Sequence, residues 1–361
     1  MTPFFQNILR RYGIKGLFEF SRRHAILGYI WDELQDELKS FNIIRDEESN
    51  KILRRWYTLV CKIEEKNRLI NEQCDVVKRK FQDEGFLPQI LKGASLASLY
   101  DNPLHRSTGD IDVWLRTNDD ISTEQRSLTY SRDEVVKYVR NIMPQSKICY
   151  HHMEFPAIDK TEIEVHFTPS WLANPYHNKH LQQFFFKNPS ISYANSQTSQ
   201  NFLFNEVFIL VHVFRHLFGE GISLKQVLDY YQVLRASQLK YCLSNFLDVL
   251  EQIGLTKFFT AILWVEKEVF ELDDKYVVLT PNEKEGRFLL DEIILKGNAF
   301  EDSSIDAQQL KMSDFTNPSH AHNFFSRVKR ANTLICHYPD EALYEIPWRI
   351  WHFFWRRMKR Y

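Results

Sequence analysis

The sequence predicts an α+β protein in which a small mixed β-sheet lies between an N-terminal and a C-terminal helical region. Helical apolar spacing fills the chain up to Gly85, short strand-like segments follow over residues 86–170, and helical spacing returns after about residue 201. We therefore divide the chain into a helical region over 1–85, a sheet-containing core over 86–170 and a helical region over 171–361.

The N-terminal region is predicted to be helical because its apolar residues recur at steps of three and four. Between Lys51 and Phe81 such residues stand at positions 52, 53, 56, 59, 60, 63, 69, 70, 74, 77 and 81. Gly85 then ends the pattern, as glycine commonly does after a helix. We expect an amphipathic helix directly before the sheet.

The central region holds the predicted strands. Residues 86–91 are predicted as a strand, 95–100 as a short helix after a glycine turn, and 111–115 as a second strand. A helix is expected over 131–143, with Ser131 as its N-cap. Segments 147–155 and 161–169 are predicted as a hairpin, because the second segment alternates polar and apolar side chains.

The C-terminal region returns to helical spacing. Residues 202–218 are apolar on nearly every face, which predicts a buried central helix. Residues 223–234 carry a single apolar stripe, and further helices are expected up to the C-terminus, with an interruption at 297–304.

Composition is that of an ordinary globular protein and limits the partners. Of 361 residues, 44% are hydrophobic and 26% are charged, and a net charge of −1 argues against a nucleic-acid partner. Five scattered cysteines favour free thiols in a reducing, cytoplasmic compartment. The sequence lacks an apolar run of about 18 residues, and its N-terminus lacks the apolar core of a signal peptide.

Two aspartates, Asp110 and Asp112, stand one residue apart at the start of an apolar strand. Side chains i and i+2 of a strand share a face, so the carboxylates would repel each other unless a cation sits between them. Removing either acid should therefore leave stability unchanged. A hard divalent ion such as Mg²⁺ fits this need, and a carboxylate from a neighbouring strand would complete its site. Glu164 is the expected third acid, and Glu162 on the same polar face is the alternative.

The residues before these aspartates suit a phosphate group. A strand that ends at Gly93 and turns into a helix exposes backbone N–H groups, and Ser95 can add a hydroxyl. Lys92 and Arg106 can add positive charge nearby. Arg106 is expected to be largely buried and to point toward Asp110, Asp112 or the Gly93 turn, where it would bind phosphate or form an ion pair that fixes the loop. Phosphate on one side and paired carboxylates on the other is the arrangement of metal-assisted phosphoryl or nucleotidyl transfer.

Further residues along the chain complete a wider pattern. Its members are Leu91-Lys92-Gly93, Pro103, Arg106, Asp110-Ile111-Asp112-Val113, Glu164-Val165-His166, His212, Arg215, His216 and Asp229. This pattern resembles the nucleotidyltransferase superfamily that includes DNA polymerase beta, and most closely the bacterial family of uncharacterised nucleotidyltransferases. The resemblance runs from about Lys51 to the C-terminus.

The resemblance implies a nucleotidyltransferase core and a reaction. An acceptor hydroxyl attacks the α-phosphorus of a nucleoside triphosphate, and pyrophosphate leaves. Two Mg²⁺ ions are implied, held by Asp110, Asp112 and Glu164. The acceptor is a small molecule, a protein side chain or a nucleic-acid end, the last disfavoured by the net charge. A metal-dependent phosphohydrolase and a non-catalytic nucleotide-binding module on the same fold are the alternatives.

Three histidines belong to the predicted hairpin. His166 shares the polar face of Glu164 and is expected either beside the site or in a structural role. His151 and His152 are expected at the surface of a strand.

His212 and His216 stand four residues apart on one predicted helix, a spacing that can bind zinc. A third ligand does not stand near them in sequence, so buried polar groups satisfied by Asp229 are the plainer interpretation. A further interpretation places Arg215, His216 or Asp229 at the border of the nucleotide pocket.

Residues 347–361 carry five Lys or Arg, no acid and three Trp. Trp348, Trp351, Trp355 and Met358 would form one stripe of a helix. Such a helix either contacts an anionic membrane surface or packs on the protein as its closing helix. We favour packing, because an apolar terminal helix is usually tied down.

Overall fold

The computed structural model describes residues 1–40, 46–117, 128–188, 199–219, 221–237, 242–296 and 320–358. Before and within the sheet region the elements are α1 (Pro3–Arg23), α2 (Leu27–Ser40), α3 (Glu47–Asp83), β1 (Phe86–Ile90), α4 (Ala94–Ala97), a 3₁₀ turn (Pro103–His105), β2 (Ile111–Thr117), α6 (Leu128–Ile142), β3 (His152–Ile158) and β4 (Thr161–His166). After it they are α7 (Pro175–Lys187), α8 (Ser199–Phe218), α9 (Leu224–Ser237), α10 (Leu243–Gln252), α11 (Thr256–Phe270), a 3₁₀ turn (Asp274–Tyr276), α12 (Glu283–Lys296), α14 (His320–Leu334) and α15 (Pro339–Met358).

The four strands form one mixed sheet in the order β1-β2-β4-β3. β2 pairs antiparallel with β1 and parallel with β4, and β4 pairs antiparallel with β3. The predicted α+β class and the hairpin are therefore confirmed. Several boundaries differ: β3 begins at His152 instead of residue 147, β4 ends at His166 instead of residue 169, and α6 begins at Leu128, so Ser131 is not its N-cap.

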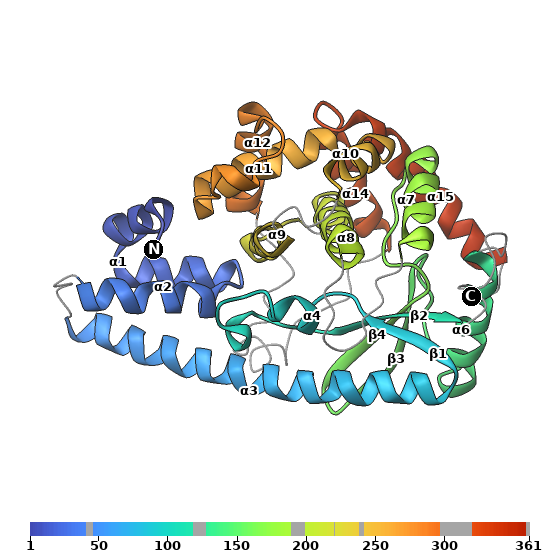
Figure 1. Ribbon diagram of the computed structural model, residues 1–361, viewed down its shortest axis with the longest axis horizontal. Coiled ribbons are helices and arrows are strands. Elements are labelled where there is room, and N and C mark those ends of the chain that lie inside the picture. Colours follow the sequence, from blue (N-terminus) through green and yellow to red (C-terminus); the bar gives the residue numbers. More distant parts are fainter. Residues whose placement is uncertain are drawn as a thin grey trace.

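The long helix α3 runs along one face of the sheet, opposite the C-terminal helices (Figure 1). Asp46 caps its first turn by accepting a hydrogen bond from the Ser49 N–H at 2.7 Å. Its second half packs against the sheet and α6 through the buried side chains Ile70, Cys74, Val77 and Phe81. The apolar stripe predicted for this helix is confirmed, except that Leu69 is exposed.

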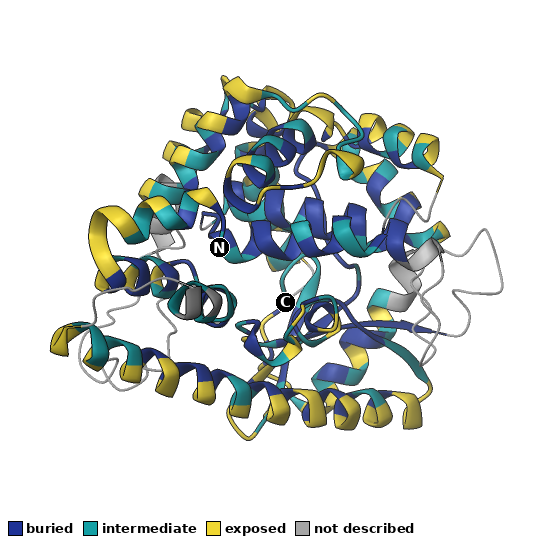
Figure 2. Cartoon of the chain, turned by 60° about the vertical axis from the view of Figure 1, so that its left-hand side comes forward, coloured by how far each residue is buried: buried dark blue, intermediate teal, exposed yellow. Residues whose placement is uncertain are grey.

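Helix α8 lies at the centre of the molecule, and most of its side chains are buried (Figure 2). This confirms the central helix predicted over 202–218. The large core around α8 takes side chains from α1 and α2 as well as from α9, α10 and α11. A smaller core lies between α3, the sheet and α6. The domain boundaries at residues 85 and 170 remain a prediction. The N- and C-terminal helices contribute side chains to the same large core, so the two cores do not correspond to the three predicted regions.

Helix α15 packs on the protein through one side. The ring of Trp348 stacks on Trp171 with centroids 3.7 Å apart, in agreement with the predicted closing helix. Its other side exposes Phe353 and Phe354. Membrane contact through 347–361 therefore remains an untested and disfavoured prediction. None of the described helices combines the length and apolar character of a membrane span. The interruption predicted at 297–304 lies outside the described residues.

Candidate active site

Three carboxylates, which we call the acidic cluster, gather at one end of β2 and β4. The parallel register sets Asp112 opposite Glu164, and Asp110 directly precedes β2. Ligand atoms of Asp112, Glu164 and His166 lie within 4.8 Å of one another. Asp112 is only 1% exposed, whereas Asp110 and Glu164 are half-buried. Glu164 lines the adjoining cavity, while the alternative, Glu162, is exposed and lies outside the cavity lining.

The Lys92 ammonium lies between the two aspartates. Its Nζ is 3.7 Å from Asp110 Oδ2 and 3.2 Å from Asp112 Oδ2, so the two carboxylates share a face. Burial alone would lower the pKa of Lys92, but Asp110, Asp112 and Glu164 together raise it above its ordinary value. In turn, burial would raise the pKa of Asp112, and the charges of Lys92 and His166 keep it below the usual range.

His166 is buried against the same acids. Its Nε2 lies 2.9 Å from Asp112 Oδ1 and 3.6 Å from Glu164 Oε2. Burial alone would lower the pKa of His166, but the two carboxylates stabilise its charged form and raise the pKa to about 9. Of the two positions expected for His166, the structure shows the one beside the acids.

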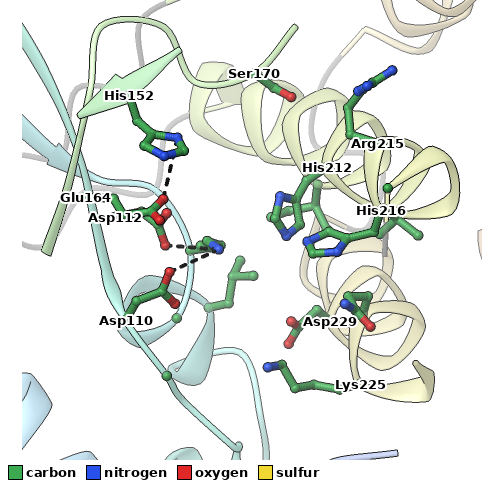
Figure 3. Close-up of a pocket in the computed structure, with 18 of the residues that line it drawn as sticks. Asp110, Asp112, His152, Glu164, Ser170, His212, Arg215, His216, Lys225 and Asp229 are labelled. Atoms are coloured by element: carbon green, nitrogen blue, oxygen red, sulfur yellow. Dashed lines mark ion pairs between the residues drawn. The ribbon is translucent and has the colours of Figure 1, made fainter. Parts of the chain in front are cut away.

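His151 and His152 also line the cavity, so the prediction that they lie at a strand surface is wrong. For His152 the cause is the register of the hairpin, which pairs it with His166 across β3 and β4. Directly paired residues of an antiparallel ladder lie on the same face. The ring of His152 consequently points to Glu164 (Figure 3), with its Nδ1 3.6 Å from Glu164 Oε2.

The donor set fits a divalent cation. Asp112 and Glu164 offer carboxylate oxygens, the ligands that Mg²⁺ prefers. Asp112 Oδ2 is buried without a hydrogen-bond donor among the described residues, and its charge is offset by the Lys92 ammonium at 3.2 Å. A divalent ion at these oxygens would supply the compensation that Lys92 gives them here. The residues present therefore agree with the predicted metal.

A cavity of about 720 Å³ adjoins the acidic cluster, a size typical of small-molecule sites. Across it, α8 and α9 present His212, His216, Lys225 and Asp229 (Figure 3). Lys66 of α3 also lines the cavity, and its pKa is lowered by burial and then by the charge of Lys225. The acidic cluster on one wall, Lys225 across from it and Lys66 in the lining suit a ligand that carries phosphate beside a metal ion.

The spacing of His212 and His216 does not create a metal site in the described part of the chain, because neither belongs to a group of three candidate ligands. Their ring centroids lie 4.5 Å apart. Burial lowers the pKa of His212 well below its ordinary value, and the charge of the nearby His216 lowers it further. Both histidines line the cavity, as do Arg215 and Asp229.

Arg106 is buried, as expected, but it points to Asp229 instead of to the acidic cluster or the glycine turn. Its Nε and Nη2 each donate to one oxygen of Asp229 at 2.7 Å, and the Tyr100 hydroxyl donates to the same carboxylate at 2.6 Å. The predicted partner was wrong because Asp229, far away in sequence, matches the planar fork of the guanidinium. The pair holds the loop before β2 against α9, and a phosphate contact remains a prediction.

Gly93 makes the turn between β1 and α4 possible. Its φ is +67°, and a Cβ there would come within 3.2 Å of the Thr108 side chain, so glycine is needed. Lys92 and Gly93 line the cavity. Ser95 is exposed and does not line it, so the predicted phosphate contact of Ser95 disagrees with its position.

The wall formed by α15 was missed by the sequence analysis. Trp348 lines the cavity together with Trp171. Arg215 lies over the ring of Trp171 at 3.7 Å and pairs with Glu341 at 2.7 Å and Glu345 at 3.0 Å. These two glutamates, four residues apart on one face of the predicted helix, were the signal for a buried cationic partner.

A comparison with protein families matches residues 13–271 to the uncharacterised nucleotidyltransferase family. The match begins before Lys51, where the motif resemblance starts, and it includes the acidic cluster, α8 and α9 but not α12, α14 or α15. Comparison with curated proteins and with solved structures gives no match. Since the matched segment covers more than half of the chain and contains the acidic cluster, this protein belongs to the uncharacterised nucleotidyltransferase family.

Proposed function

We propose that the protein transfers a nucleoside monophosphate from a nucleoside triphosphate to a hydroxyl acceptor and releases pyrophosphate. The observation that carries the proposal is the acidic cluster at the edge of a 720 Å³ cavity whose far wall contains Lys225. Family membership supports the reaction class.

In this proposal Asp110, Asp112 and Glu164 hold Mg²⁺, with two ions expected from the resemblance. When bound, Mg²⁺ polarises the phosphate and offsets its developing negative charge. Lys92 contacts the same acids and lines the cavity, so its ammonium is within the site where it would bind a phosphate oxygen. Most of the rate would come from positioning and from charge neutralisation.

Glu164 is better suited to hold a cation than to take the acceptor's proton. Burial would raise the pKa of its carboxyl, but His166 and His152 keep it below the usual range. A general base works best when its pKa is near the working pH, and the pKa of Glu164 is shifted away from neutral pH. This favours the ligand role for Glu164.

The acceptor we propose is a small molecule or a protein side chain, since the net charge of −1 does not favour a nucleic acid. Five unpaired cysteines support a reducing, cytoplasmic setting.

The test uses the full chain with each of the four α-labelled nucleoside triphosphates and Mg²⁺, with and without a small-molecule or a protein fraction of cell extract. Pyrophosphate release with label transfer is expected, and it should be absent in Asp110→Asn. Glu162→Gln is the matched control, since Glu162 lies on the same strand but outside the cavity lining, and it should stay active. Release of inorganic phosphate alone would favour the phosphohydrolase, and nucleotide binding without turnover would favour the non-catalytic module.

A further inference from the structure

Three imidazole rings lie against the acidic cluster and are not explained by a magnesium site. The Nε2 of His151 and the Nδ1 of His152 are 3.0 Å apart, and the ring centroid of His166 is 5.3 Å from those of both other histidines. Ligand atoms of the three rings all lie within 4.8 Å of one another. Two of these rings face Glu164: the Nδ1 of His152 and the Nε2 of His166 are each 3.6 Å from Glu164 Oε2.

A separation of 3.6 Å is too long for a hydrogen bond but close to the spacing of two ligands on one metal ion. Atoms that are each about 2.1 Å from a shared ion lie roughly 3.0 Å apart at a right angle and roughly 3.4 Å apart at the tetrahedral angle. The imidazole nitrogens of His152 and His166 thus each lie near ligand spacing from the Glu164 oxygen with which they would share an ion.

The chemistry of the donors indicates the class of metal. Magnesium prefers oxygen ligands and water, whereas imidazole nitrogen suits zinc, cobalt and nickel. The Nε2 of His166 also lies 2.9 Å from Asp112 Oδ1, so an ion bound at this nitrogen would replace that contact.

We propose that His152, Glu164 and His166, with His151 beside them, form a site for one first-row transition-metal ion such as Zn²⁺. The inference deepens the proposed function and rests on it for the role of the ion, because the site shares Glu164 with the proposed magnesium ligands. The ion site itself depends on the geometry alone.

The test measures metal binding without nucleotide. The chelator-treated full chain is titrated with Co²⁺, followed by visible absorption, and then with Zn²⁺ by calorimetry, in the presence of millimolar Mg²⁺. One equivalent of Co²⁺ should bind, Zn²⁺ should displace it, and Mg²⁺ should not. His152→Asn should weaken Co²⁺ binding by at least about tenfold, as expected when a ligand is lost.

His180→Asn is the matched control, because His180 on α7 lies outside the cavity lining, and its affinity should stay within about twofold of wild type. Glu164→Gln is the second ligand variant, and melting curves establish that both variants fold. Equal Co²⁺ affinity in wild type, His152→Asn and Glu164→Gln would overturn the inference, as would displacement of Co²⁺ by Mg²⁺ or the lack of any Co²⁺ binding.

Asp110→Asn separates this inference from the proposed function. Asp110 is not in either group of candidate ligands, so this variant should keep Co²⁺ binding while it loses transfer. If the protein binds Co²⁺ but transfers no nucleotide from any nucleoside triphosphate, the metal site is supported and the proposed function is wrong. If the protein releases pyrophosphate with Mg²⁺ but does not bind Co²⁺, the proposed function is supported and the transition-metal site is wrong.

Discussion

Asp110 and Asp112 share a face of one strand but differ in burial and in partners. Asp112 is 1% exposed and contacts both Lys92 and His166, whereas Asp110 is half-buried and lies 3.7 Å from Lys92. Asp112→Asn should therefore lower the free energy of unfolding by up to about 3–5 kcal/mol, the range for breaking a buried ion pair from one side. Asp110→Asn should change it by less than about 1 kcal/mol.

Urea unfolding of the two variants measures this difference, and both should lose nucleotidyl transfer. The sequence-based expectation that neither change affects stability considered only the repulsion between two carboxylates, and it omitted the buried cations that Asp112 compensates. Equal stability of the two variants would show that Lys92 and His166 find other partners.

Arg106 offers a second prediction at the scale of one residue. Two parallel hydrogen bonds of 2.7 Å join it to Asp229 in a buried site, and Lys cannot reproduce the planar fork. Arg106→Lys should therefore lower the free energy of unfolding by about 1–3 kcal/mol. Arg235→Lys is the control, since the guanidinium of Arg235 is part-exposed and lies 4.0 Å from Asp101. Weaker nucleotide binding by a fully stable Arg106→Lys protein would instead indicate phosphate contact.

At the scale of elements, α15 is held at the cavity by side chains from outside the sheet. Trp348 stacks on Trp171, and Arg215 of α8 pairs with two glutamates in the first turns of α15. The family match ends at residue 271, so this wall of the cavity is contributed by a segment beyond the matched region.

The anchoring of α15 gives the third prediction. Trp348→Ala removes the stacked ring, and the loss should be about 2 kcal/mol, below the 3–5 kcal/mol of a fully buried tryptophan because Trp348 is half-buried. Hydrogen exchange over residues 339–358 should accelerate, while exchange in the central helix α8 stays slow. Phe354→Ala is the control, since Phe354 is 55% exposed and its loss should leave exchange unchanged. Unchanged protection of α15 in Trp348→Ala would contradict the anchoring role.

Prediction from the sequence succeeded where the signal is local. The 3.6-residue spacing of α3, the alternation in β4 and the apolar faces of α8 each depend on neighbours within one element. The prediction that Asp110 and Asp112 share a face succeeded for the same reason. Contacts between distant segments could not be predicted in this way, because the partner of Arg106 is 123 residues away and the place of His152 depends on strand register.

At the scale of the whole molecule, the N- and C-terminal helices share one core around α8, and that core contains two acids. Glu206 of α8 and Glu266 of α11 are both 0% exposed. Burial, and then the nearby charge of Glu206, raise the pKa of Glu266 well above its ordinary value. Burial raises the pKa of the Tyr231 phenol on α9, and the charge of Glu266 adds to this rise. The folded protein therefore releases the proton of Glu266 at a higher pH than the unfolded chain does.

This proton makes the stability of the molecule depend on pH, with a definite sign. Above the ordinary pKa of 4.5 the unfolded chain releases the proton from Glu266 while the folded protein keeps it, so the free energy of unfolding falls as pH rises towards the folded pKa. The slope from one such group is at most about 1.4 kcal/mol per pH unit. Glu266→Gln keeps the shape of the protonated acid and removes its titration, so the variant should gain stability over wild type progressively from pH 5 to pH 8. Urea unfolding at each pH measures the gain, with the exposed Glu268→Gln as a control that should run parallel to wild type. A constant difference between Glu266→Gln and wild type across this range would mean that Glu266 is ionised in the folded core.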